Sequence, residues 1–142
     1  MPFTPNPTPV YAAGPIAAGP IVLPSTAKTV FTDQTNAVQL LAATANNRQV
    51  ITGLSVEVTA TLTAGKLLAF LSLGATAGQT FEVGSVAHAA LTVSTTAAVA
   101  PIAFAFTPTA PLIIPEGYSL WLASAVAQPA GALVGYGIGK IF

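Results

Sequence analysis

The chain has 142 residues, of which 53% are hydrophobic and only 6% are charged, with a formal net charge of zero. A soluble globular domain averages about 25% charged residues, and a net charge near zero promotes association. The length suits one domain with a real core. The chain has no cysteine, which excludes a disulfide framework and a Cys-based metal site. We therefore expect much of the surface to be covered, either by other protein subunits or by lipid.

Protein neighbours are the favoured cover. Residues 97–106 form the longest apolar run, which Pro101 interrupts and which is shorter than the roughly 20 residues of a membrane-spanning helix. The four basic residues are scattered and form no aromatic-basic cluster, so we expect no nucleic-acid partner. The first seven residues lack the basic and apolar regions of a signal peptide. We expect no membrane partner and no secretion.

Residues 1–24 differ in composition from the remainder of the chain. Seven of the twelve prolines lie in this segment, which has no charged side chain. Proline fixes φ and removes an amide donor, so the segment is expected to be extended and neither a helix nor a central strand. Disordered tails are usually polar, whereas this segment is apolar. We interpret residues 1–24 as an extended arm laid across a neighbouring subunit, with a free tail as the alternative, and residues 25–142 as the folded domain.

Short strands are predicted from residue 27 onward. The clearest is 51–62, where apolar and polar residues alternate strictly and Leu54, Val56 and Val58 share one face. This period of two is typical of a half-buried antiparallel strand. Residues 66–73 are apolar on both faces, so we expect both faces of that strand to be covered.

The other expected strands are regularly spaced. Pro115-Glu116-Gly117 is a compact turn signal between two of them. Residues 35–45 are the one competitor for a helix, and we interpret them as strand and turn. Eight or nine strands at this spacing predict an all-β chain, arranged as an antiparallel, two-sheet β-sandwich. The remaining expected strands are 27–32, 38–41, 81–87, 99–106, 112–114, 119–125 and 133–142.

The last expected strand carries three glycines on one face. Glycine inside a strand often marks the close approach of another backbone. We therefore expect this face to lie near a subunit axis or under a covering arm, and a merely permissive edge strand is an equal alternative. The candidate assembly contacts are Val10, Tyr11, Ile16, Ile21, Val22, Leu23, Gly135, Gly137 and Gly139.

The sequence shows no constellation for chemistry. His88 is the single histidine, and neither a second His nor a Cys is present to complete a zinc site. A catalytic triad needs a nucleophile, a base and an orienting group, and no motif supplies them. The four carboxylates lie on different elements, and Trp121 is expected in the core. We predict a protein that is not an enzyme, with no catalytic, cofactor-binding or metal-binding residue and no cofactor.

Three segments carry a resemblance to a known group of proteins. They are Thr-Gly-Leu-Ser-Val-Glu-Val-Thr-Ala at 52–60, Leu-Leu-Ala-Phe-Leu at 67–71, and Pro-Leu-Ile-Ile-Pro-Glu-Gly-Tyr-Ser-Leu-Trp-Leu-Ala at 111–123. Over about residues 48–136 the pattern resembles small structural virion proteins of tailed bacteriophages. The resemblance implies a jelly-roll-like β-sandwich on the particle surface, as a head decoration (cement) protein or as a component of the tail or head fibre.

The resemblance also implies how the protein assembles. The resemblance implies a virion protein assembled in the host cytoplasm, whose partners are further copies of itself, with a trimer favoured, and the major capsid protein or other virion proteins. The alternative is a receptor- or glycan-binding module of a phage fibre or tail, since the same sandwich can serve either role. That role needs exposed aromatic and polar loop residues, and the loops 74–80 and 92–98 offer few.

Overall fold

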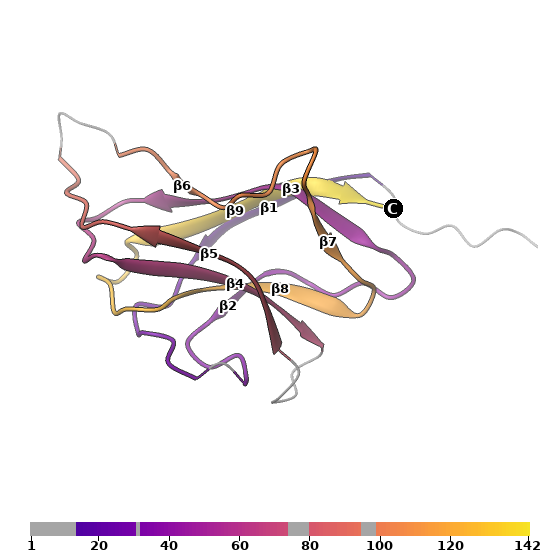
Figure 1. Cartoon of the computed structure of the whole chain (residues 1–142), viewed down its shortest axis with the longest axis horizontal. Coiled ribbons are helices and arrows are strands. Elements are labelled where there is room, and N and C mark those ends of the chain that lie inside the picture. The colour runs from indigo at the N-terminus through magenta and orange to yellow at the C-terminus, as the bar shows by residue number, and fades with distance from the viewer. Residues whose placement is uncertain (1–13, 31, 74–79, 95–98) are drawn as a thin grey trace, which may run out of the picture.

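A computed structural model describes residues 14–30, 32–73, 80–94 and 99–142. Over these residues the chain is all β, in two antiparallel sheets packed against each other (Figure 1), so the predicted β-sandwich is confirmed. The described residues include no helix with the length and apolarity needed to span a membrane. The strands are β1 (Gly14–Val22), β2 (Val38–Leu41), β3 (Gln49–Val58), β4 (Gly65–Leu73), β5 (Thr80–His88), β6 (Ile102–Ala103), β7 (Leu112–Ile114), β8 (Tyr118–Ser124) and β9 (Leu133–Ile141).

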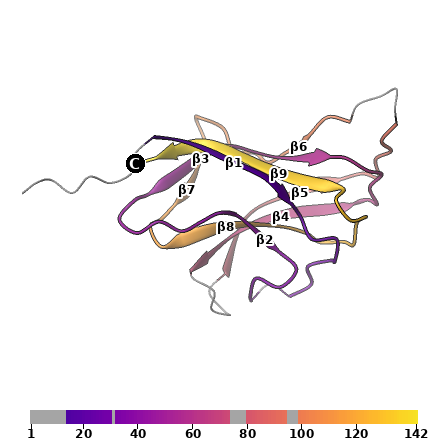
Figure 2. The same ribbon diagram turned by 180° about the vertical axis from the view of Figure 1, so that it is seen from behind.

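The strand order is that of a jelly roll. Sheet A has the order β1-β9-β3-β6, with β7 pairing to the same edge of β3 as β6, and sheet B has the order β2-β8-β4-β5. The chain crosses between the sheets repeatedly, and its first described strand lies beside its last, as seen from behind in Figure 2. Double-sheet jelly rolls arrange their strands in this way.

Several predicted elements agree closely with the structure. The strands at 38–41 and 112–114 have the predicted bounds. In β3 the residues Leu54, Val56 and Val58 are buried and Glu57 is exposed, which confirms the predicted alternation. The strand pairing stops at Val58, and Leu62 continues only as an isolated bridge to Leu91.

Two strand predictions are wrong in extent. Residues 27–30 and 32 form no strand. They belong to a connecting segment that hydrogen-bonds to β8 through the amide of Lys28 and the carbonyl oxygen of Ser124, at 2.8 Å. Within the expected strand 99–106, only Ile102–Ala103 pair as β6. Phe104 is nevertheless buried, so this residue of the expected apolar face still points into the core.

The described part of the expected arm is an edge strand of the sandwich. Residues 14–22 form β1, which pairs with β9, and an edge strand tolerates the missing amides of proline. A bulge between Ala18 and Ile21 contains the cis Gly19–Pro20 bond. Ile16 lies in the core, so residues 14–22 are part of the sandwich rather than of a segment outside it.

The core lies between the sheets, and a second buried layer lies outside sheet B. Leu67 and Leu71 of β4 point into the main core. Leu68 and Phe70 point to the opposite face of β4 and are also buried, with 2% and 4% of their surface exposed. The expectation that β4 is covered on both faces is therefore confirmed.

Candidate interaction surface

The arm residues of the predicted assembly set are divided between core and surface. Val10 and Tyr11 lie outside the described residues. Ile16 and Leu23 are buried in the core, and Ile21 is half-buried against it. Among the described arm residues in the set, only Val22 is largely exposed, with 53% of its surface accessible.

The glycines of β9 are explained by packing inside the subunit. Gly135 and Gly137 are buried. An added Cβ on Gly135 would lie 2.6 Å from Cδ1 of Leu122, and one on Gly137 would lie 3.2 Å from Cδ2 of Leu40. Both leucines come from sheet B, so the glycines form a notch into which the opposite sheet inserts its side chains. Gly135 and Gly137 thus offer no surface to a neighbouring subunit.

Gly139 and the residues that cover Gly135 are also closely packed. An added Cβ on Gly139 would collide with the carbonyl oxygen of Val50 in β3. The expected covering arm is present in part, because Ile21 and Leu23 lie 3.3 and 3.4 Å from the Cβ position of Gly135.

The outer face of sheet A is the most apolar exposed surface of the described residues. Four of the seven large hydrophobic side chains that are exposed among them lie here, namely Val22, Ile113, Ile138 and Phe142. Strand register produces this clustering, because Val50 pairs with both Lys140 and Ile113 and all three side chains share one face. Monomeric proteins rarely expose large apolar patches without a function for them.

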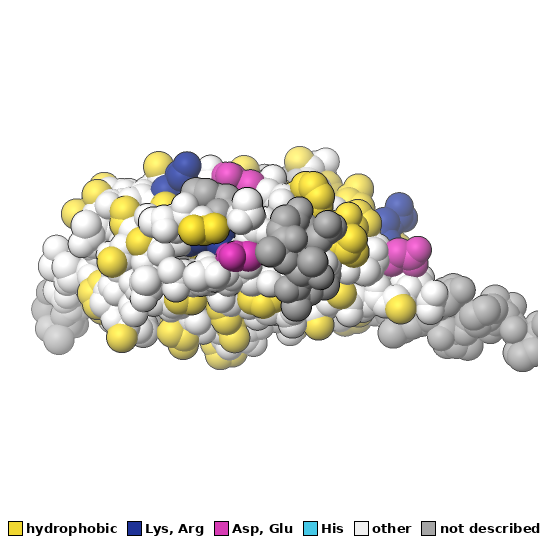
Figure 3. Space-filling model, turned by 90° about the horizontal axis from the view of Figure 1, so that it is seen from below, with side chains coloured by type: hydrophobic (Ala, Val, Ile, Leu, Met, Phe, Trp, Pro, Cys, Tyr) yellow, Lys and Arg dark blue, Asp and Glu magenta, His cyan; other side chains and the backbone are white. Residues whose placement is uncertain are grey.

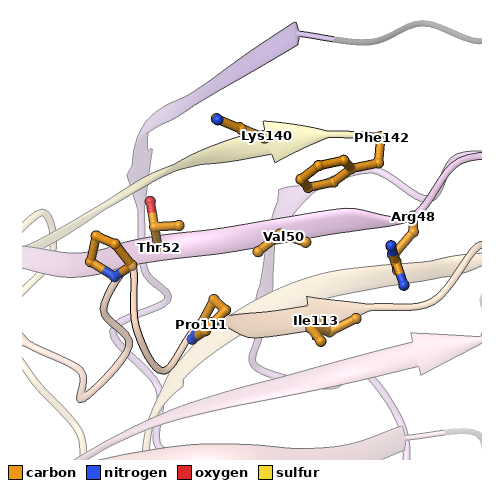
Figure 4. A pocket seen from close by; sticks show the side chains of 8 residues that line it. Arg48, Val50, Thr52, Pro111, Ile113, Lys140 and Phe142 are labelled. Carbon is orange, nitrogen blue, oxygen red and sulfur yellow. The ribbon is translucent and has the colours of Figure 1, made fainter.

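A groove runs across this face. Its volume is about 520 Å³, within the size range of small-ligand sites. Figure 4 shows side chains from β3, β7 and the end of β9 surrounding it. We call it the sheet-A groove, and its lining residues are Arg48, Val50, Thr52, Pro108, Pro111, Ile113, Lys140 and Phe142.

Two hydrogen bonds made by the backbone of Phe142 hold the aromatic wall of the groove. The amide of Phe142 donates to the carbonyl oxygen of Arg48 at 2.9 Å, and Nδ2 of Asn47 donates to the carbonyl oxygen of Phe142 at 2.8 Å. The Arg48 guanidinium lies 5.7 Å from the centroid of the Phe142 ring, a cation–π distance. An adjoining hollow of about 510 Å³ shares Arg48 and Phe142 and extends to Glu116.

A polar pair lies farther along the same face. The hydroxyl of Tyr136 donates a hydrogen bond to Oε2 of Glu57 at 3.0 Å. This hydrogen bond to a carboxylate raises the pKa of the Tyr136 hydroxyl above its ordinary value, with smaller contributions from burial and from the negative charge of Glu57.

The described residues bring no catalytic set together. Nδ1 of His88 lies 3.1 Å from the carbonyl oxygen of its neighbour Ala89, and its buried Nε2 has no hydrogen-bond partner. No group of three or more His, Asp or Glu residues within the described ranges could hold a metal ion. Glu57, Glu82 and Glu116 lie on β3, on β5 and in the turn before β8.

Sequence reasoning missed the role of Lys28, which is buried with 2% of its surface exposed. Its Nζ donates to the carbonyl oxygens of Asp33 and Thr35, both at 2.8 Å. Burial lowers the pKa of this amine, and the negative charge of Asp33 partly opposes that shift. Lys28 thereby fixes the segment before β2 over Phe70. The sequence of β4 could have indicated such a segment, because a strand that is apolar on both faces needs another part of the chain to cover its outer face.

The remaining surface is poor in charge. In the face shown in Figure 3 only a few charged side chains are visible, among many apolar and neutral ones. No protein-family model, curated protein or solved structure matches the chain.

Proposed function

We propose that this chain is a non-enzymatic structural protein of a virion, a capsid decoration (cement) protein that attaches through apolar subunit contacts. The observation that carries the proposal is the outer face of sheet A, where Ile113 and Phe142 line the sheet-A groove and Ile138 is exposed as well. Full burial of a side chain of this kind contributes about 1.5–3 kcal/mol, and these side chains, which are 52–59% exposed, have about half of that left to gain in an assembly.

The scarcity of charge supports the same role. Only 6% of the residues are charged, so most of the surface can pack against other subunits without the cost of removing an ion from water. The charged side chains described above on the sheet-A face are Arg48, Lys140 and Glu57, and these have to be paired or left at the edge of a contact. The partners we propose are further copies of the chain, as a trimer, and the major capsid protein. A fold alone does not identify a function, so the proposal depends on this surface and on the sequence resemblance to phage virion proteins.

The test is to locate the chain in the particles whose genome encodes it. Mass spectrometry of purified particles should detect the chain, and cryo-electron microscopy should show its sandwich on the outside of the head shell. The proposal fails if the chain is missing from the particles. It also fails if the density lies at a fibre tip in contact with a receptor or glycan.

Occupancy measurements then test the surface. Purified Ile113→Glu protein, added to particles that lack the chain, should occupy them at least about tenfold more weakly than the unchanged chain, since 1.4 kcal/mol corresponds to a factor of ten. Phe81→Glu is the matched control, because Phe81 of β5 has the same 52% exposure as Ile113 but lies in sheet B. Equal occupancy by the two variants would contradict the assignment of this face.

A further inference from the structure

We propose that the sheet-A groove binds residues 1–13 of a second copy of this chain. The inference rests on the part of the proposed function that places several copies side by side. It names the occupant of the groove, which would be an uncharged, proline-rich extended segment.

The chemistry of the groove suits such a segment. Phe142, Pro108, Pro111, Val50 and Ile113 provide apolar walls, and extended proline-rich peptides dock in aromatic-lined grooves. Within the described part of the chain, no acidic side chain lines the groove.

The polar rim is complementary to a proline-rich backbone. Proline removes an amide donor but keeps its carbonyl acceptor, so such a segment presents an excess of acceptors. Arg48 and Lys140 line the groove, and both are donors without acceptor capacity. A segment with many carbonyl groups and few amides therefore matches this rim better than an ordinary strand does.

Residues 1–13 have the required composition. They contain Pro2, Pro5, Pro7 and Pro9 and have no charged side chain. Apolar groups for the groove are also available, and these are Phe3, Val10 and Tyr11.

The position of Gly14 favours a neighbouring copy over the same copy. Gly14 pairs with Ile141 and Pro15 pairs with Lys140, so β1 begins at the end of sheet A where the groove lies. To enter its own groove the segment would have to turn back beside Gly14 and cross the end of β9. A semi-rigid proline-rich segment resists such a reversal. Thirteen residues span about 40 Å at ~3.1 Å per residue. Three strand spacings across sheet A amount to only about 14 Å, so the segment is longer than the width of its own sheet and can extend past its edge.

Isotope-coded photo-crosslinking of the full-length protein tests the proposal. The photoreactive residue p-benzoylphenylalanine replaces Phe3, and ¹⁴N-labelled and ¹⁵N-labelled chains are mixed before irradiation. We expect crosslinked peptides that join position 3 to residues 108–114, with the two halves carrying different isotopes. The same photoreactive residue at Phe81, which lies on β5 outside the groove, is the matched control and should not reach residues 108–114.

A second variant checks the groove itself. Ile113→Glu in the full chain should reduce the mixed-isotope crosslinks from position 3 at least about tenfold, while Phe81→Glu should leave them unchanged. Circular dichroism confirms that both variants keep the β-fold.

Each other outcome overturns the inference. If the two halves of every crosslink carry the same isotope, a chain's own segment fills the groove. Crosslinks to another surface, or no crosslinks, would show that residues 1–13 do not bind there. The assay contains only the purified chain, so its failure is separate from the failure of the virion proposal, which particle localisation decides.

Discussion

The Nζ of Lys28 lies 5.0 Å from the centroid of the Phe70 ring, over the outer face of sheet B. The opposite neighbour of Phe70 is Trp121, whose ring stacks on it with a centroid distance of 6.3 Å and an interplanar angle of 16°. Lys28 thus contacts Phe70, which in turn contacts its cross-strand neighbour Trp121, and this cluster joins the segment before β2 to the centre of sheet B. The segment before β2, which covers the outer face of sheet B, is therefore held in place by side-chain contacts.

Replacement of Lys28 by Met should lower the free energy of unfolding by about 1–3 kcal/mol. The variant keeps the apolar stem but leaves the carbonyl oxygens of Asp33 and Thr35 without their donor. Urea unfolding followed by Trp121 fluorescence measures the change. Lys66→Met is the control, because Lys66 of β4 is exposed, and it should have an effect within about 0.5 kcal/mol. Equal loss in both variants would contradict the role of Lys28.

Replacement of Gln128 by Ala should also destabilise the sandwich by about 1–3 kcal/mol. The buried Gln128 side chain accepts a hydrogen bond from the Thr63 amide at 2.9 Å and donates one to the Thr63 carbonyl oxygen at 2.7 Å, so it satisfies the chain where β3 has ended. Thermal unfolding measures the effect. Gln39→Ala, at an exposed position of β2, should change little, and a larger loss there would sink the argument.

Replacement of Gly135 by Ala should cost about 1–3 kcal/mol, because overpacking of a filled core forces side chains off their preferred rotamers. The added Cβ would lie 2.6 Å from Cδ1 of Leu122. Leu122→Val removes that methyl group, so the double variant should lose less stability than the two single losses added together. Strict additivity in denaturant unfolding would show that Leu122 does not occupy the notch.

Replacement of Glu57 by Gln should lower the pKa of Tyr136 toward its ordinary value of 10.0, because the carboxylate that favours the protonated phenol is removed. The sign of the linked stability follows from the raised pKa. The contribution of this pair is fully present below the pKa of the unfolded chain, near 10, and is lost as the pH rises through the folded value. Absorbance titration of the phenolate measures the pKa, with Glu116→Gln as the control. An unchanged Tyr136 titration in Glu57→Gln would contradict the prediction.

Local patterns predicted most of the strands. The alternation in β3 and the turn at 115–117 are decided by neighbouring residues, and the structure has both, with Gly117 at φ 85° and the Tyr118 amide donating to the carbonyl oxygen of Pro115 at 3.2 Å. The strand β1 was not predicted from the sequence. A bulge at Gly19–Pro20 interrupts its alternation, and its prolines suggest a segment without strand pairing.

The parts of the surface that depend on distant residues could not be predicted. The sheet-A groove combines residues from 48 to 142, and only the register between β3, β7 and β9 brings them together. The glycines of β9 were recognised as a close-packing signal, but their partners Leu40 and Leu122 lie on the other sheet. Sequence spacing within one strand contains no information about which element packs against it.

The pairing of β1 with β9 has a consequence for synthesis. Gly14 pairs with Ile141, which lies far later in the sequence, so sheet A cannot close until residue 141 has left the ribosome. Until then β9, which lies between β1 and β3, is missing and both strands expose unpaired edges, the kind of surface on which nascent chains misassociate. High contact order of this type places folding in the range of milliseconds to seconds. The interval between translation of β1 and completion of β9 is therefore the period in which this apolar chain is most vulnerable to aggregation.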